Sequence, residues 1–186
     1  MHNKFLKKYY FINKFDPVHL TSLDKNILLI YRNYTEKTNE NLIIKMKQYC
    51  KKSGRKLFLA NNFRLAIKLD LDGVYIPSFN KDLSLNSFTL KKKFKIIGSI
   101  HNLKDIKIKE VQNVQELFIG SLFKIKETYL GIYKFKNLCK LTKIPVIALG
   151  GIKDSNFKAL NLLNIKGFSG ISYFNSQKKR ASKRGP

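Results

Sequence analysis

Eight short apolar runs, separated by mostly helical connectors, constrain the fold of this chain more than any other feature. The runs are rich in β-branched and aromatic residues, as in strands that are buried on both faces. They are Lys8–Asn13, Asn26–Tyr31, Lys56–Ala60, Gly73–Pro77, Lys95–Ile100, Glu116–Gly120, Ile144–Leu149 and Gly167–Tyr173. Strands that alternate with helices indicate a parallel sheet, and eight such units predict an α/β fold of the closed (β/α)8 type, a TIM barrel.

The connectors make this barrel a compact one, because 186 residues is well below the roughly 250 residues typical of the fold. Phe15–Lys25 is too short and too interrupted by proline to form a good helix, and little chain remains after Tyr173. We therefore expect reduced first and last helices. An open doubly wound sheet is the alternative, but no GxGxxG motif follows the first strand.

The hydrophobic period of a helix recurs in most connectors. Asn39–Lys52 is the strongest amphipathic pattern, with Asn39 or Thr38 to cap its start and Gly54 to end it. Phe79–Lys93 reads as a polar loop that leads to a weak helix. Further helices are predicted over Asn62–Leu69, His101–Val111, Gly131–Lys143 and Lys153–Asn164.

We expect a single barrel domain over residues 1–175, followed by a basic tail over residues 176–186. The stretch Gln177–Pro186 carries five basic residues and has no apolar pattern. Such a segment is typical of a disordered, solvated terminus. Contact between this tail and RNA is the alternative.

The formal net charge of the chain is +25, which suggests a polyanionic partner such as nucleic acid. The basic residues are spread along the whole chain, however, and an AT-rich genome would also produce this abundance of Lys, Asn and Ile. Nucleic-acid binding is therefore the less favoured interpretation. A field of this sign also attracts phosphorylated small molecules.

Nothing in the sequence indicates a membrane or secretory destination. No stretch of about 18 uncharged apolar residues occurs, and the N-terminus lacks the apolar core and cleavage site of a signal peptide. Cys50 and Cys139 lie in apolar helical patterns without metal-binding spacing. We expect two reduced, buried thiols in a cytoplasmic protein. The oligomeric state is not predicted.

The seventh run, Ile144–Leu149, continues directly into Gly150 and Gly151. Glycine has no Cβ, so the backbone can turn sharply there and a ligand can come close. A strand, a glycine turn and a following helix favour phosphate binding, because backbone N–H groups point at the ligand. A tight turn without a ligand is the alternative explanation of the same pattern.

Several segments, in the same order, resemble one enzyme family. IPVIALGGI, with Asn156 five residues after Gly151, and GFSGISYF resemble the C-terminal half of thiamine-phosphate synthase and the related TenI proteins. RKLFLANNFRLAIKLDLDGVYI, IIGSIHN and FIGSLF resemble earlier strands and loops of the same family. The resemblance extends from Tyr9 to Phe174 and implies a (β/α)8 barrel, in agreement with the eight runs.

The resemblance also implies a reaction of thiamine biosynthesis, in which hydroxymethylpyrimidine diphosphate condenses with a thiazole phosphate and pyrophosphate is released. Mg2+ and basic residues would hold the leaving pyrophosphate, and the barrel would place the thiazole nitrogen beside the reacting CH2 group. Mg2+ takes hard oxygen ligands, usually carboxylates and phosphates. The implied partners are phosphorylated thiazole and pyrimidine compounds.

The half of the site that binds thiazole phosphate is retained. The resemblance places this phosphate on the glycine after strand seven and on an Ile-Ser pair after strand eight. The corresponding residues are Gly151, Ile171 and Ser172, with Gly150 and Gly170 beside them. A phosphate corner after the last two strands is common in barrels of this type.

The half that binds the pyrimidine diphosphate departs from the family pattern. Of the Gln-x-Arg-x-Lys motif after strand two only Arg32 remains, with Ile30 and Tyr34 in the other two places. Lys126 could replace the lysine of the loop after strand six, and Lys124 lies near it. A site rich in these basic residues could hold a diphosphate by direct charge.

The metal ligands of the family are also replaced. The aspartate after strand three corresponds to Asn61, and the aspartate after strand four falls near Phe79 or Asn80. The family's histidine on strand four becomes Tyr75. Because each amide removes a full negative charge, we expect Mg2+ binding to be possible but weakened.

Three residues are candidates for catalysis under the resemblance: Arg32, Ser99 and Lys126. TenI-type proteins with thiazole tautomerase activity use a histidine where Ser121 stands here, so that activity lacks its acid or base. His101 is the remaining acid or base candidate near a strand end, but a surface position at the start of a helix is the favoured explanation of this residue.

Three hypotheses follow from the residues and the resemblance. The first is a transferase of the thiamine-phosphate synthase type with unusual site chemistry. The second is a catalytically degenerate barrel that senses or carries a phosphorylated thiamine precursor. The third is a basic protein that contacts RNA through its charged surface and tail.

Overall fold

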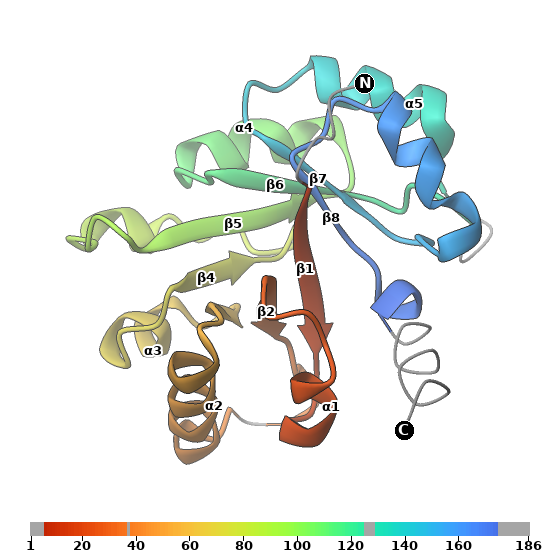
Figure 1. Ribbon diagram of the computed structural model, residues 1–186. Coiled ribbons are helices and arrows are strands. Elements are labelled where there is room, and N and C mark those ends of the chain that lie inside the picture. The colour runs from red at the N-terminus through yellow and green to blue at the C-terminus, as the bar shows by residue number, and fades with distance from the viewer. Residues whose placement is uncertain (1–5, 37, 125–128, 175–186) are drawn as a thin grey trace, which may run out of the picture.

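The computed structural model describes residues 6–36, 38–124 and 129–174, and eight parallel strands form its centre (Figure 1). Each strand pairs with the next strand in the chain, and the last pairs with the first. The ring is closed and has no exposed edge, which confirms the predicted (β/α)8 barrel. The predicted basic tail over residues 176–186 lies outside the described residues.

The strands lie close to the predicted runs. They are β1 (Lys7–Ile12), β2 (Ile27–Tyr31), β3 (Leu57–Ala60), β4 (Gly73–Ile76), β5 (Lys95–Ile100), β6 (Glu116–Gly120), β7 (Val146–Leu149) and β8 (Gly167–Ser169). β7 begins later than predicted because Pro145 has no N–H group to donate to a ladder. β8 ends earlier than predicted because the chain turns at Gly170 and residues 171–174 are helical.

The connectors of the described chain contain α-helices and two 3-10 helices. They are α1 (Pro17–Thr21), α2 (Glu40–Ser53), α3 (Phe63–Lys68), η1 (Ser84–Ser87), α4 (Leu103–Val111), α5 (Gly131–Lys140) and η2 (Asp154–Leu162). The first connector forms a helix of only five residues. Asp16 caps it and Pro17 takes a first-turn position, where no N–H group is needed. Its small size agrees with the predicted reduced first helix.

The α-helix predicted over Lys153–Asn164 is a 3-10 helix instead, so this prediction was wrong. Asn156 Nδ2 donates to Gly151 O at 2.9 Å, and Asn156 Oδ1 accepts from Lys153 N at 2.9 Å. These local side-chain bonds compete with the α-helical pattern in the first turn. The weak helix predicted after Phe79 is also a short 3-10 turn, η1.

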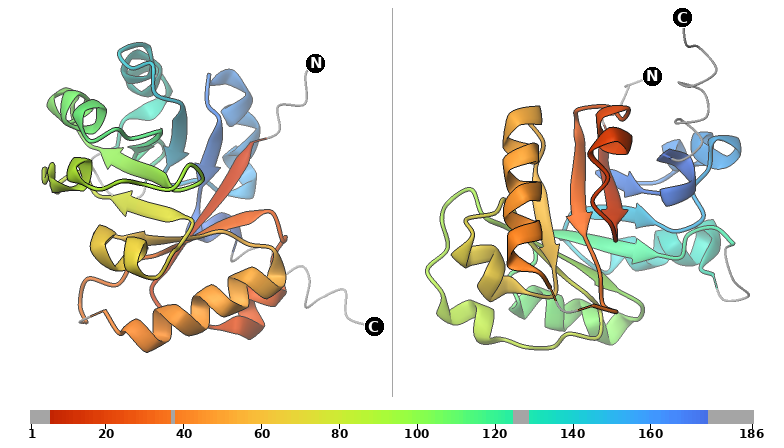
Figure 2. Two further views of the ribbon diagram at one scale, coloured as in Figure 1. Left: turned by 90° about the vertical axis from the view of Figure 1, so that its left-hand side faces the viewer. Right: turned by 90° about the horizontal axis from the view of Figure 1, so that it is seen from below.

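The helices lie outside the ring of strands (Figure 2). Apolar side chains form two layers, one inside the barrel and one between the strands and these helices. The inner layer consists of Tyr9, Phe11, Ile30, Phe58, Ala60, Tyr75, Ile97, Phe118 and Ile147. Several of these rings pack edge to face, with the centroids of Tyr9 and Phe118 5.0 Å apart. The barrel is therefore a packed core and gives the site above it a rigid floor.

The helices of the described ranges also settle two smaller points. None is long and apolar enough to cross a bilayer.

Cys50, on α2, is buried as predicted, whereas Cys139, on α5, is only half-buried, so that part of the prediction was wrong. Both thiols are free, and burial raises the pKa of Cys50 to about 12 and that of Cys139 to about 11.

Candidate functional site

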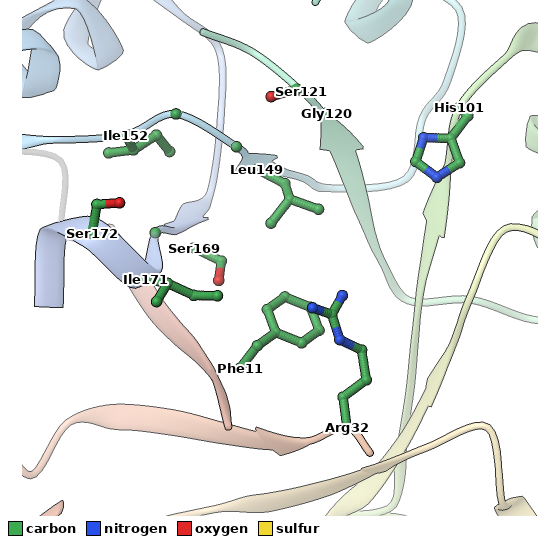
Figure 3. Close-up of a pocket in the computed structure, with 13 residues that line it drawn as sticks. Phe11, Arg32, His101, Gly120, Ser121, Leu149, Ile152, Ser169, Ile171 and Ser172 are labelled. Carbon is green, nitrogen blue, oxygen red and sulfur yellow. The ribbon is translucent and has the colours of Figure 1, made fainter. Parts of the chain in front are cut away.

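A cavity of about 610 Å³ opens at the carboxyl end of the strands, where barrels of this kind carry their active sites. Strand ends form its floor and the loops that follow them form its rim (Figure 3). Its lining residues are Phe11, Arg32, His101, Gly120, Ser121, Leu149, Gly150, Gly151, Ile152, Ser169, Gly170, Ile171 and Ser172. The structure thus brings the residues predicted to bind phosphate into one cavity with Arg32.

We call the turns after β7 and β8 the glycine corner: Gly150, Gly151, Gly170, Ile171 and Ser172. Gly150 has a φ of +93° and Gly151 a φ of +70°, a left-handed backbone that other residues rarely adopt. A Cβ at Gly151 would lie 2.6 Å from a backbone oxygen of the loop after β6. Conformation and space therefore both require glycine at this corner.

The glycine corner offers N–H donors to the cavity. Within the described ranges, no acceptor is found for the backbone N–H groups of Gly151, Ile171 and Ser172. Ser172 lies among the helical residues 171–174, not in a strand as predicted, and its exposed side chain lines the cavity. Backbone N–H groups without acceptors, gathered at one corner of a cavity, are an arrangement that binds phosphate.

Ser169, at the end of β8, places a hydroxyl beneath the glycine corner. Its side chain is fully buried, and its Oγ has no hydrogen-bond partner among the residues that the structure describes. In Figure 3 this oxygen is turned toward the cavity, near Ile171 and Phe11. A buried hydroxyl without a partner costs about 1–3 kcal/mol, so an acceptor on a ligand would complete this part of the site.

Arg32 supplies a positive charge across the cavity from the glycine corner (Figure 3). It follows β2, and its Cζ lies 4.7 Å from the centroid of the Phe11 ring. This cation–π contact holds the flat guanidinium over the floor. The guanidinium forms no ion pair with any described carboxylate. A half-buried, unpaired guanidinium favours an anionic ligand.

Asn61 and Asn80 stand where the family resemblance places metal-binding aspartates. Asn80 Nδ2 donates to Asn61 Oδ1 at 2.7 Å, so the two amides are bonded to each other. In the described part of the chain, no three His, Cys, Asp or Glu side chains gather as they would around a metal ion. An uncharged amide pair with one oxygen already engaged does not fit Mg2+, which prefers carboxylate oxygens.

The other predicted candidates contribute less to the cavity. Ser99 is buried in β5 and does not line the cavity. The exposed His101 stands at the rim, opposite the glycine corner (Figure 3). Lys126 lies outside the described residues, so its role stays a prediction.

Burial shifts the pKa values of two groups at this end of the barrel, Tyr34 and Lys109. It raises the pKa of Tyr34 to about 12, with a smaller contribution from Tyr75 and an opposing one from Arg32. Burial also lowers the pKa of Lys109, on α4, to about 8, although the nearby Asp105 opposes the shift. Tyr34 is therefore neutral and Lys109 protonated at neutral pH.

Some residues of this site do not stand out in the sequence. Phe11 and Leu149 read as ordinary core positions of strands, and Ser169 as a strand residue of no special role. Lys109 reads as one of many solvated lysines. Its spacing of three residues from Ile106, which shares a buried face of α4, is the signal that could have revealed its burial.

Comparison with known proteins agrees with this geometry. A family model described as thiamine monophosphate synthase (TMP-TENI) matches residues 22–174. The chain belongs to the thiamine monophosphate synthase family. The resemblance predicted from the strand and loop motifs is thereby confirmed.

Two relatives named thiamine-phosphate synthase indicate how far the likeness to this family extends. The protein of Pelagibacter ubique is 32% identical over 170 residues, which cover 87% of this chain and 81% of that protein. The protein of Methanococcus vannielii is 28% identical over 120 residues, which cover 62% of this chain and 57% of that protein.

Solved structures share the barrel. The thiamine phosphate pyrophosphorylase of Pyrococcus furiosus superposes with a TM-score of 0.73 at 16% identity, over 96% of each chain. FabK of Thermotoga maritima reaches a TM-score of 0.67 at 12% identity, over 91% of this chain and 59% of that chain. At such identities the likeness shows the fold alone, because one fold serves proteins of different function.

Proposed function

We propose that this member of the thiamine monophosphate synthase family binds a thiazole phosphate at the glycine corner and joins it to hydroxymethylpyrimidine diphosphate held by Arg32. One observation carries the proposal. A single cavity has the N–H donors of the glycine corner on one side and the unpaired Arg32 guanidinium on the other. Two anionic groups can therefore be bound at once, one on each side.

The proposed reaction is a displacement at the CH2 carbon of the pyrimidine. A bond forms between the thiazole nitrogen and this carbon, while the bond from the carbon to the diphosphate oxygen breaks. Its electron pair leaves with pyrophosphate. Negative charge grows on the leaving oxygen, and Arg32 would stabilise it through charge-assisted hydrogen bonds. Holding both substrates in one cavity removes much of the entropic cost of bringing them together.

The apolar lining has a separate role in this proposal. Phe11 and Leu149 face the cavity between its two anion-binding sides, and Ile152 lines it beside the glycine corner. Heterocyclic rings pack well against such side chains. The same side chains would exclude water from the reacting carbon, which favours transfer to the thiazole over hydrolysis.

Binding without turnover, as in a sensor or carrier of a thiamine precursor, is the second candidate function. The bonded pair of Asn61 and Asn80 favours it, because the positions assigned to metal carry no carboxylate. Under this alternative the glycine corner keeps its ligand, but Arg32 takes part in no chemistry.

Calorimetric titration with thiazole phosphate and a pyrophosphate-release assay with both precursors test the proposal. Arg32→Ala should slow pyrophosphate release about 100-fold and change the affinity for thiazole phosphate little. Arg64→Ala is the matched control. Arg64 also stacks on an aromatic ring, that of Phe63, at 5.9 Å, but lies outside the cavity.

Ser172→Asp tests the glycine corner without disturbing its glycines. A carboxylate is tolerated at the start of a helix but repels a phosphate, so the affinity for thiazole phosphate should fall at least about tenfold. Unchanged affinity would place the phosphate elsewhere and refute the proposal. Binding by the wild-type chain without any pyrophosphate release would select the second candidate.

A further inference from the structure

Behind the pair of Asn61 and Asn80 lies a buried cation that belongs to the chain itself. Lys109, on α4, is 0% exposed. Its ammonium donates to Pro77 O at 2.9 Å, Asn80 O at 2.8 Å and Gln112 Oε1 at 2.8 Å. These three acceptors match the three N–H groups of an ammonium, as a buried charge requires. The contact fixes the loop after β4 to α4.

Gln112 completes this attachment. It is also 0% exposed, and its Nε2 donates to Asn80 O at 3.1 Å and to Asp82 O at 2.9 Å. Lys109 and Gln112 lie three residues apart, on one face of the helix end. Together they hold the loop after β4 at the carbonyl groups of Pro77, Asn80 and Asp82.

The fixed loop determines which atoms of the amide pair remain available. Asp82 N donates to Asn80 Oδ1 at 2.8 Å, which orients the Asn80 amide with its nitrogen toward Asn61. That nitrogen donates to Asn61 Oδ1 at 2.7 Å. Both side-chain oxygens are therefore engaged. The pair keeps three N–H donors, two on Asn61 and one on Asn80, and each oxygen, already accepting one bond, keeps a single further lone pair.

These donors lie at the same end of the barrel as Arg32, although neither asparagine is among the lining residues of the cavity. Arg32, Asn61 and Asn80 follow three adjacent strands, β2, β3 and β4, at the same end of the barrel. The ring of Tyr34, just after Arg32, contacts the ring of Phe79, just before Asn80, at a centroid distance of 5.8 Å. The loops after β2 and β4 therefore meet across the end of β3.

The charges around the pair suit an anion and oppose a metal ion. The carboxylate of Asp82, the acidic residue of this loop, accepts from Ser84 N at 2.8 Å and Ser84 Oγ at 2.7 Å. The ammonium of Lys109 lies directly behind Asn80. A divalent cation would meet N–H groups in front and a positive charge behind, whereas a phosphate oxygen would find both favourable.

We propose that the Asn61–Asn80 pair binds the diphosphate of the pyrimidine substrate directly through its N–H donors, without a divalent metal, and that Lys109 is the residue that positions the pair. This inference rests on the function proposed above and specifies how its second anion is held. This half of the site then presents hydrogen-bond donors to an anion, where a metal site would present oxygen ligands to a cation.

Calorimetric titration with inorganic pyrophosphate, in EDTA and in excess Mg2+, tests the inference. The wild-type chain should bind pyrophosphate in EDTA, and Mg2+ should not raise the affinity. Asn61→Asp should lower the affinity in EDTA at least about tenfold, because a carboxylate replaces N–H donors. Binding of Mn2+ alone to the wild-type chain, seen by electron paramagnetic resonance, or an affinity that requires Mg2+, would overturn the inference.

Lys109→Met tests the positioning role. It should lower pyrophosphate affinity about tenfold and speed hydrogen exchange of the backbone amides in the loop after β4. Thiazole phosphate affinity at the glycine corner should not change, because β7 and β8 lie across the ring. Lys107→Met, two residues earlier on the exposed face of α4, is the control. It should change the affinity for neither pyrophosphate nor thiazole phosphate. Equal losses for both ligands in Lys109→Met would reduce Lys109 to a general role in stability.

Gln112→Ala is the second variant, for the case that Lys109→Met does not fold. It keeps the lysine but removes the bonds to Asn80 O and Asp82 O and one of the three acceptors of the Lys109 ammonium, Gln112 Oε1. A folded Gln112→Ala chain with unchanged pyrophosphate affinity would refute the positioning. The wild-type chain could also bind pyrophosphate in EDTA but release none from the two precursors. That result would refute the proposed reaction and leave this inference standing.

Discussion

Two glycines, Gly54 and Gly151, separate the effects of conformation and space at the level of single residues. Their φ values are nearly equal, +67° and +70°. A Cβ at Gly54 would meet nothing within 4 Å, whereas a Cβ at Gly151 would lie 2.6 Å from Phe123 O. Gly54 ends a helix in open space, and Gly151 turns the chain against a neighbouring loop. The shape of the glycine corner therefore depends on the absence of one atom.

We predict that Gly54→Ala lowers the free energy of unfolding by about 1 kcal/mol, the cost of a left-handed alanine. Gly151→Ala should lower it by about 2–4 kcal/mol, because its Cβ must also displace a backbone. Urea denaturation of both variants measures the difference. Equal losses would mean that the glycine corner relaxes around a methyl group.

The predictability of single residues depends on whether their role is local. Gly150 and Gly151 were predicted from their place directly after an apolar run, since a turn there needs no knowledge of distant residues. The bond between Asn61 and Asn80 was not predicted, because it depends on how two loops meet. The burial of Lys109 was not predicted for the same reason, as its three acceptors are largely supplied by another connector.

At the level of the strands, an ionic cluster around one buried carboxylate closes the end of the barrel opposite the cavity. Glu116, at the start of β6, is 3% exposed and pairs with Lys7 on β1 and, at 3.4 Å, with Lys95 on β5. The hydroxyl of Tyr9, also on β1, donates to the same carboxylate. Because β1 and β6 are not neighbours in the ring, this cluster joins opposite parts of the barrel.

We predict that this cluster makes the fold sensitive to acid. Burial by itself raises the pKa of Glu116, but hydrogen bonds from Lys7 and Tyr9 and the nearby positive charges outweigh it, so the pKa lies below its ordinary 4.5. A carboxyl with a lower pKa in the folded chain stabilises it above the unfolded pKa, and this stability is lost as pH falls through the folded pKa. The free energy of unfolding should therefore fall below about pH 4.5.

Urea denaturation across this pH range, with Glu116→Gln beside the wild-type chain, measures the effect. The variant should be less stable at neutral pH, because two lysines lose their partner, and its stability should depend less on pH in the acid range. Glu110→Gln, on the exposed face of α4, is the control and should keep the wild-type slope. An equally steep slope in Glu116→Gln would contradict the assignment.

Strands were predicted better than helices, for a physical reason. A strand buried on both faces shows as an apolar run whatever its neighbours are, and all eight were located. The type of the connector after β7 depends instead on the side-chain bonds of Asn156, which the helical period does not reveal. The end of β8 depends on a turn at Gly170 that lies inside an apolar run.

At the level of the whole molecule, an excess of positive charge acts on the fold. The net charge is +25, and the ion pairs Lys8–Asp24, Lys68–Glu40 and Lys91–Asp70 of the described chain lie at the surface. Surface pairs contribute little stability. The repulsion among the remaining lysines and arginines therefore opposes the compact state.

We predict that the Tm rises when KCl is raised from about 0.01 M to about 1 M, because the screening length falls from about 30 Å to about 3 Å. Calorimetric or circular-dichroism melting curves measure the change. The same experiment with glycerol in place of salt separates screening from general solvent effects. A Tm that stays constant or falls with KCl would show that the fold already balances its charges locally.

The closed ring of strands keeps the glycine corner and the Asn61–Asn80 pair apart, and this separation affects how such proteins can diverge. The glycine corner depends on β7 and β8, whereas the amide pair depends on β3 and β4, and the two share no stretch of backbone. Substitutions can therefore accumulate on one side of the ring while the other side keeps its shape. A lineage built in this way can exchange one ligand and retain its second, so the step from enzyme to receptor, or back, needs no change of fold.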